Sequence, residues 1–193
     1  VMKTRNKKKS NLTLILMIIA ALAIVAVLLF WNPESAVAEP DPQSQEQLEA
    51  STIAKSGMEA PNFTVEMFDG ESIRLSDLRG KVVLVNFWAT WCPDCRKDVP
   101  KMKELYGKYA SDNVIFIGIS FDKNDEVWMK YIRENGMEWL QHREQKPKNE
   151  SQVSIDYHVK WIPSIYVIGP DGKIMLGTVM IEKLEKLLET IGK

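Results

Sequence analysis

The chain has 193 residues, with 25 basic and 26 acidic side chains and two cysteines. This length suits one domain with appended segments, and two cysteines are too few for a disulfide framework, which uses four or more. Five of the basic residues lie in residues 1–11, which contain no acid, so the remainder holds 20 basic and 26 acidic residues. A mildly acidic body gives no electrostatic reason to bind nucleic acid.

An uncharged apolar segment follows the basic residues directly. Residues 12–31 read LTLILMIIAALAIVAVLLFW, with Thr13 as the only hydroxyl and Trp31 at the end. A helix of this length is about 30 Å long, which matches the hydrocarbon core of a bilayer. Because the basic residues come first, the positive-inside rule places residues 1–11 in the cytoplasm and the C-terminal body outside. The segment is therefore predicted to be a single transmembrane signal anchor.

A cleaved signal peptide is the alternative interpretation of the same segment. Ala36-Val37-Ala38 fits a cleavage site of the A-x-A type. Cleavage near Ala38 would leave a secreted or periplasmic protein. The apolar run is longer than the roughly 7–15 residues of a signal-peptide core, which favours a retained anchor. Both interpretations place the body outside the cytoplasm.

A linker is predicted between the anchor and the body. Residues 32–58 are rich in proline, glutamine, serine and glutamate and contain no aromatic side chain. Such a composition cannot bury enough apolar surface to offset the entropy of an ordered chain, so it predicts a flexible linker with a short helix at most over residues 45–55. The folded body is then residues 59–193, which is long enough for one substantial core.

The body alternates strand and helix patterns. Residues 81–89 (KVVLVNFWA) and 113–121 (NVIFIGISF) are apolar runs of β-forming residues, typical of strands buried on both faces. Hairpins are predicted to turn at Asp69-Gly70 and at Asp171-Gly172. A short strand is expected over 138–142, and helices are expected over 93–109, 125–134, 151–158 and 182–190. This pattern predicts an α/β fold with a mixed central sheet flanked by helices.

The two cysteines, Cys92 and Cys95, lie in the segment NFWATWCPDCRKDVP, residues 86–100. A haem attachment of the C-x-x-C-H type is excluded because Arg96 follows the second cysteine. A structural zinc ion needs four ligands, and the other candidates are His142 and His158, so no metal site is expected. A redox-active pair and two unreactive buried thiols remain as alternatives.

The residues around the pair favour redox chemistry. Cys92 follows a buried strand, and Pro93 stands where a helix would begin. At this position, backbone N–H groups and the helix dipole stabilise a thiolate and lower the pKa of the thiol below the free value of about 8.5. Cys95 lies one turn further along the same face and can close a disulfide. We expect Cys92 to be an exposed attacking thiol and Cys95 a more buried resolving thiol.

The segment NFWATWCPDCRKDVP resembles the active site of membrane-tethered bacterial thiol–disulfide oxidoreductases of the TlpA/ResA type, in the AhpC/TSA-redoxin-like branch of the thioredoxin superfamily. The resemblance covers residues 59–193 and includes VIFIGISFD, the inserted segment with Trp128 and Tyr131, and VKWIPSIYVIGPDGKI. It implies a thioredoxin-like fold with an N-terminal hairpin and an inserted segment, anchored in the bacterial cell membrane. It also implies a redox-active disulfide in place of any other cofactor.

The resemblance assigns roles to the matching positions. Cys92 would be the nucleophile and Cys95 the resolving thiol. Ile162-Pro163 aligns with a cis-proline loop that lies beside the disulfide and presents its backbone to substrate. Trp91, next to Cys92, is expected to form part of an apolar docking surface.

Three further residues bear on the chemistry of the pair, two on proton transfer and one on the direction of electron flow. Asn86 stands where thioredoxins have a buried acid, and the family carries an acid after the second cysteine, which is Asp98 here. Asp98 is either a proton relay for Cys95 or a solvated helix residue. Asp94 lies between the cysteines, where a carboxylate opposes a thiolate and makes the dithiol a better electron donor, unless it is exposed and screened. We therefore predict a reductant.

The leading hypothesis is an extracytoplasmic enzyme that reduces protein disulfides through Cys92 and Cys95. Electrons must then cross the membrane, because the outside compartment is oxidising. The resemblance implies a membrane electron donor of the thiol–disulfide relay type and, for some members, apocytochrome c as substrate in cytochrome c maturation. One alternative is a peroxiredoxin-like thiol peroxidase, although Ala89 occupies the place of its threonine and Thr90 is one residue off. The other is a non-catalytic membrane-tethered binding module with an inert disulfide.

Overall fold

The computed structural model describes residues 16–19, 56–67 and 70–192. Residues 16–19 form one helical turn inside the predicted anchor. Within the described ranges, no helix is long and apolar enough to cross a membrane. The rest of the predicted anchor, most of the predicted linker and residue 69 of the first predicted turn lie outside the described residues.

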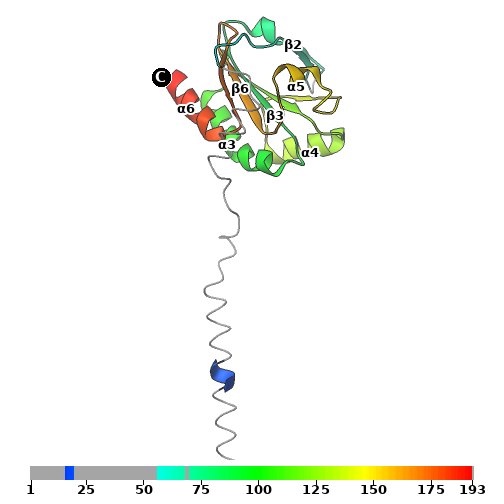
Figure 1. Ribbon diagram of the computed structural model, residues 1–193, viewed down its shortest axis with the longest axis vertical. Helices are drawn as coiled ribbons and strands as arrows, with labels where there is room; N and C mark the ends of the chain where they lie inside the picture. Colours follow the sequence, from blue (N-terminus) through cyan, green and yellow to red (C-terminus); the bar gives the residue numbers. More distant parts are fainter. Residues whose placement is uncertain (1–15, 20–55, 68–69, 193) are drawn as a thin grey trace, which may run out of the picture. The chain divides into compact units, whose positions relative to one another are not determined.

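A five-stranded mixed sheet forms the centre of the body, in the order β5-β4-β3-β6-β7 (Figure 1). β4 is parallel to both β3 and β5, whereas β6 is antiparallel to both β3 and β7. The strands are β3 (Val82–Trp88), β4 (Val114–Ser120), β5 (Leu140–Arg143), β6 (Ser164–Ile168) and β7 (Ile174–Thr178). The mixed sheet that the sequence predicts is confirmed.

Helices and a small hairpin cover the two faces of the sheet (Figure 1). The hairpin and α5 pack on one face, while α3, α4 and α6 contribute to the core on the other. The covering elements are β1 (Thr64–Glu66), β2 (Ser72–Arg74), the 3-10 helix η2 (Leu75–Leu78), α3 (Pro93–Tyr109), α4 (Asp125–Asn135), α5 (Gln152–Asp156) and α6 (Ile181–Ile191). The predicted helix over residues 93–109 has the observed bounds of α3.

The residues of β3 alternate between the two cores. Val85 and Phe87 point into the core beneath the hairpin and α5, whereas Leu84 and Trp88 point into the core beneath α3 and α6. All four side chains are buried. Because both faces of β3 are covered, its sequence is a continuous apolar run rather than an alternation of apolar and polar residues. The strand buried on both faces is therefore confirmed.

A buried carboxylate ties the end of β3 to the end of β4. Asp122 accepts hydrogen bonds from the backbone N–H and the hydroxyl of Thr90, at 2.9 and 2.6 Å, and from the hydroxyl of Ser120 at 2.6 Å. The Thr90 hydroxyl is thus engaged in a structural contact. This cluster fixes the loop that leads from β3 to the first cysteine.

Replacing this carboxylate should destabilise the fold. We expect Asp122→Ala to lower the free energy of unfolding by about 3 kcal/mol, because it leaves buried N–H and O–H donors without their charged acceptor. Urea unfolding followed by circular dichroism measures the effect. Asp112→Ala, at an exposed acid in the loop before β4, serves as the control and should change stability little. Equal stability of the two variants would contradict the structural role of Asp122.

Candidate active site

Cys92 occupies the N-cap position of α3, and Pro93 is the first residue of that helix. The Sγ atom of Cys92 accepts a hydrogen bond from the backbone N–H of Cys95 at 3.2 Å. This N–H group and the positive end of the helix dipole favour negative charge on the sulfur once the disulfide is reduced. The helix-start position that the sequence predicts for Cys92 is confirmed.

The two cysteines form a disulfide, with their Cα atoms 5.3 Å apart. Cys92 is 5% exposed and Cys95 is 3% exposed, so both belong to the core that lies beneath α3. The expectation of an exposed Cys92 is therefore wrong for the disulfide form. The physical reason is that the bond between the two sulfurs holds both of them against the end of β3, where they pack with Trp88 and Ala89.

A loop distant in the sequence completes the surroundings of the disulfide. The peptide bond between Ile162 and Pro163 is cis, as the resemblance implies. The carbonyl oxygen of Ile162 lies 3.5 Å from the Sγ atom of Cys92. The sheet brings these residues together, because Ser164 at the start of β6 pairs with Phe87 near the end of β3.

Asp98 carries the perturbed carboxyl group of the site. It lies three residues after Cys95 on α3 and is partly buried. Its pKa is raised from 3.8 to about 7, mainly by burial and in part by the negative charges of Glu182 and Asp94, while Lys97 opposes the shift. A carboxyl group with this pKa gains and loses a proton near neutral pH, as an acid–base catalyst must.

Asp94 and Asn86 have different surroundings from Asp98. The carboxylate of Asp94 is exposed and forms an ion pair with Lys97 at 3.2 Å. Solvent and this partner screen its charge, so the structure favours the alternative in which Asp94 influences the thiolate little. Asn86 is buried on β3, and its Oδ1 atom has no hydrogen-bond partner among the described residues. It supplies an uncharged group where thioredoxins have an acid.

The tryptophans of the site divide between core and surface. Trp88 is buried, and its ring lies 5.9 Å from the ring of Tyr131. Trp91 is 60% exposed, as expected for a docking surface. Trp161 is 56% exposed and directly precedes the cis-proline pair. The sequence interpretation assigned no role to Trp161, and its place beside the Ile162-Pro163 motif was the one signal that could have indicated it.

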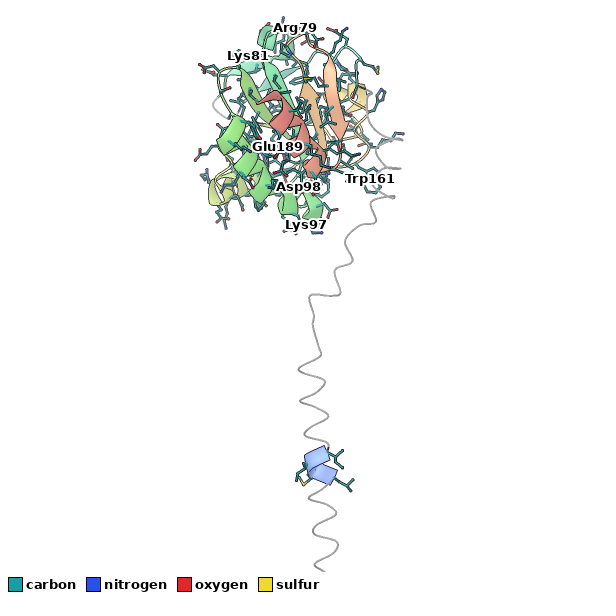
Figure 2. The ribbon with its side chains drawn as sticks, turned by 90° about the vertical axis from the view of Figure 1, so that its left-hand side faces the viewer. Arg79, Lys81, Lys97, Asp98, Trp161 and Glu189 are labelled. Atoms are coloured by element: carbon teal, nitrogen blue, oxygen red, sulfur yellow. A yellow bond between two sulfur atoms is a disulfide. The ribbon has the colours of Figure 1, made fainter. Side chains whose placement is uncertain are left out.

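Two surface hollows of the body are lined by other residues. One of about 120 Å³ is lined by residues that include Arg79 and Lys81, and another of about 220 Å³ by residues that include Met67 and Trp139. Neither is lined by the cysteines or the cis-proline loop. Figure 2 shows Arg79 and Lys81 at the end of the body opposite to Lys97, Asp98 and Trp161. The cysteine pair therefore lies outside both hollows.

Comparison with known proteins identifies the class of enzyme. Residues 56–176 match the AhpC/TSA family. The thiol–disulfide oxidoreductase ResA of Bacillus thuringiensis (strain Al Hakam) is 36% identical over 138 residues, which are 70% of this chain and 78% of that protein. The chain belongs to the AhpC/TSA family and is a thiol–disulfide oxidoreductase of the ResA type. The enzyme class and the family that the sequence predicts are thereby confirmed.

Solved structures of related oxidoreductases share the fold. The thioredoxin domain of a thiol–disulfide oxidoreductase from Bacteroides vulgatus has a TM-score of 0.65 and 30% identity, and the match covers 72% of this chain and 98% of that one. A thiol:disulfide interchange protein from Bacteroides sp. has a TM-score of 0.63 and 31% identity, covering 72% and 90%. The oxidoreductase body is thus thioredoxin-like, as expected.

The raised pKa of Asp98 predicts a pH-dependent stability. Between about pH 4 and pH 7 the folded protein holds a proton on Asp98 that the unfolded chain has lost. The free energy of unfolding should therefore fall as pH rises, by up to about 1.4 kcal/mol per pH unit from this group. Asp98→Asn should remove that slope, as measured by urea unfolding of the oxidised protein at several pH values. Asp112→Asn is the control, and parallel profiles for wild type and Asp98→Asn would contradict the shift.

Proposed function

We propose that this oxidoreductase is tethered to a bacterial cell membrane and reduces the disulfides of exported proteins. The contact that carries the proposal is the hydrogen bond from the Cys95 N–H to the Cys92 sulfur, beside the cis-proline loop. The order of the basic residues 1–11 and the apolar residues 12–31 supports an extracytoplasmic body. The likeness to ResA of Bacillus thuringiensis supports thiol–disulfide exchange as the reaction.

The reaction proceeds by two thiolate attacks. In the reduced enzyme, the Cys92 thiolate attacks one sulfur of the substrate disulfide, and the other substrate sulfur leaves as a thiolate that takes up a proton. Cys92 and the substrate are then joined in a mixed disulfide. Cys95 loses its proton and attacks the Cys92 sulfur, which releases the second substrate sulfur. Two electrons have passed to the substrate, and the enzyme holds the Cys92–Cys95 disulfide of the structure.

Asp98 is proposed as the proton relay for Cys95. The two residues are three positions apart on α3, so their side chains lie on the same side of the helix. A carboxyl group with a pKa of about 7 can accept the Cys95 proton at the resolving step and return it when the disulfide is reduced again.

The partners follow from the compartment and the family. A disulfide on the outside of the membrane needs electrons from the cytoplasmic side, so we propose a membrane electron donor of the thiol–disulfide relay type. Apocytochrome c is proposed as a substrate, which would place the enzyme in cytochrome c maturation, as the TlpA/ResA resemblance implies.

A resolving-cysteine variant tests the function directly. In Cys95→Ser, Cys92 can still attack, but no second thiol releases the substrate, so a stable mixed disulfide should accumulate with exported proteins. Non-reducing electrophoresis and mass spectrometry identify the trapped partner. The double variant Cys92→Ser/Cys95→Ser is the control and should trap nothing. The proposal would be contradicted if Cys95→Ser formed no adduct and the purified wild-type protein also failed to reduce insulin.

The reduction potential tests the direction of electron flow. A reductase must have a potential lower than that of its substrates, so we expect a value nearer to thioredoxin, at about −270 mV, than to the strong oxidants. Equilibration with glutathione or dithiothreitol buffers measures it. Because Asp94 is exposed and ion-paired, Asp94→Asn should shift the potential by less than about 20 mV. A wild-type value above about −180 mV would contradict the reductive direction.

A further inference from the structure

Two exposed tryptophans are chain neighbours of residues at the disulfide. Trp91 directly precedes Cys92, and Trp161 directly precedes Ile162, whose carbonyl oxygen is 3.5 Å from the Cys92 sulfur. Their side chains are 60% and 56% exposed. Figure 2 places Trp161 at the same end of the body as Lys97 and Asp98. Single exposed apolar residues are common, but here one exposed indole neighbours Cys92 in the chain and the other neighbours its contact Ile162.

The backbone that carries Trp161 is held in place by hydrogen bonds. The hydroxyl of Ser164 donates to the carbonyl oxygen of Trp161 at 2.8 Å. The ammonium group of Lys148, from the loop before α5, donates to the carbonyl oxygen of Val159 at 3.2 Å and to that of Lys160. The loop is therefore fixed while the indole remains exposed. A side chain on a fixed backbone loses little entropy when it binds a partner.

The reaction determines which part of the substrate comes near Trp91 and Trp161. A substrate cysteine must approach Cys92 closely enough to form a mixed disulfide. The residues on either side of that cysteine then lie within reach of Trp91 and of Trp161, which stand next to Cys92 and to its contact Ile162. A large apolar side chain at such a position removes its own surface and that of an indole from water, whereas a small polar side chain gains little.

We propose that Trp161 is a specificity-determining residue, which selects disulfides whose reactive cysteine is flanked by a large apolar or aromatic side chain. The proposal rests on the disulfide-reductase function proposed above and names its class of substrate. Lys148 is a positioning residue in this proposal, because it holds the loop on which Trp161 is displayed.

A pair of matched peptides tests the selection. Each peptide has blocked termini and one intramolecular disulfide, and the two differ only in having leucine or serine next to the reactive cysteine. We expect the reduced wild-type enzyme to reduce the leucine peptide about tenfold faster, in kcat/KM, than the serine peptide. Trp161→Ser should bring the two rates within about twofold. Hydroxyethyl disulfide, which has no flanking residue, should react equally with wild type and Trp161→Ser.

Controls separate recognition from folding. Trp161→Phe keeps an aromatic surface and should keep most of the preference, and Met175→Ser removes an exposed apolar residue of β7 and should keep all of it. Lys148→Met should reduce the preference mainly through a higher KM for the leucine peptide. Lys148→Arg, which retains hydrogen-bond donors, should restore it.

The possible outcomes separate this proposal from the function on which it rests. If wild type reduces hydroxyethyl disulfide but treats the two peptides alike, or if Trp161→Ser keeps the tenfold preference, the role of Trp161 is overturned and the reductase function stands. If wild type reduces none of the three disulfides, the proposed function itself fails.

Discussion

The hydrogen bond from the Cys95 backbone N–H to the Cys92 sulfur is the contact on which the rest of the site depends. It exists because β3 ends at Trp88 and Pro93 starts α3 immediately after the first cysteine. Helix starts leave backbone N–H groups without intrahelical partners, and here one of those groups meets a sulfur. The short connection between β3 and α3 is in turn fixed by Asp122 through Thr90.

Two aspartates on the same helix have different chemical roles because their surroundings differ. Asp94 and Asp98 lie one turn apart on α3, yet Asp94 is exposed and paired with Lys97, while Asp98 is partly buried with Glu182 nearby. Burial and neighbouring negative charge raise the pKa of Asp98 and favour its neutral form. One residue type thus supplies a solvated surface charge and a group suited to proton transfer.

The site is a surface assembled from two distant parts of the chain. The cysteine pair comes from the start of α3, and the cis-proline loop with Trp161 comes from the start of β6. The antiparallel pairing of β3 with β6 brings them together. A surface of this kind suits a protein substrate that contains a disulfide. The mixed disulfide with Cys92 retains such a substrate during the reaction, so a deep binding pocket is not needed.

The sequence by itself determined the elements and the chemistry of the cysteine pair, because these depend on neighbouring residues. The apolar run of β3, the proline at the start of α3 and the spacing of Cys92 and Cys95 are all local signals. Only the tertiary structure decided that both cysteines are buried in the disulfide, that the pKa of Asp98 is raised, and that the loop carrying Trp161 brings the Ile162 carbonyl to the reactive sulfur. Burial and electrostatic fields sum over residues that are remote in the chain, so no local pattern contains them.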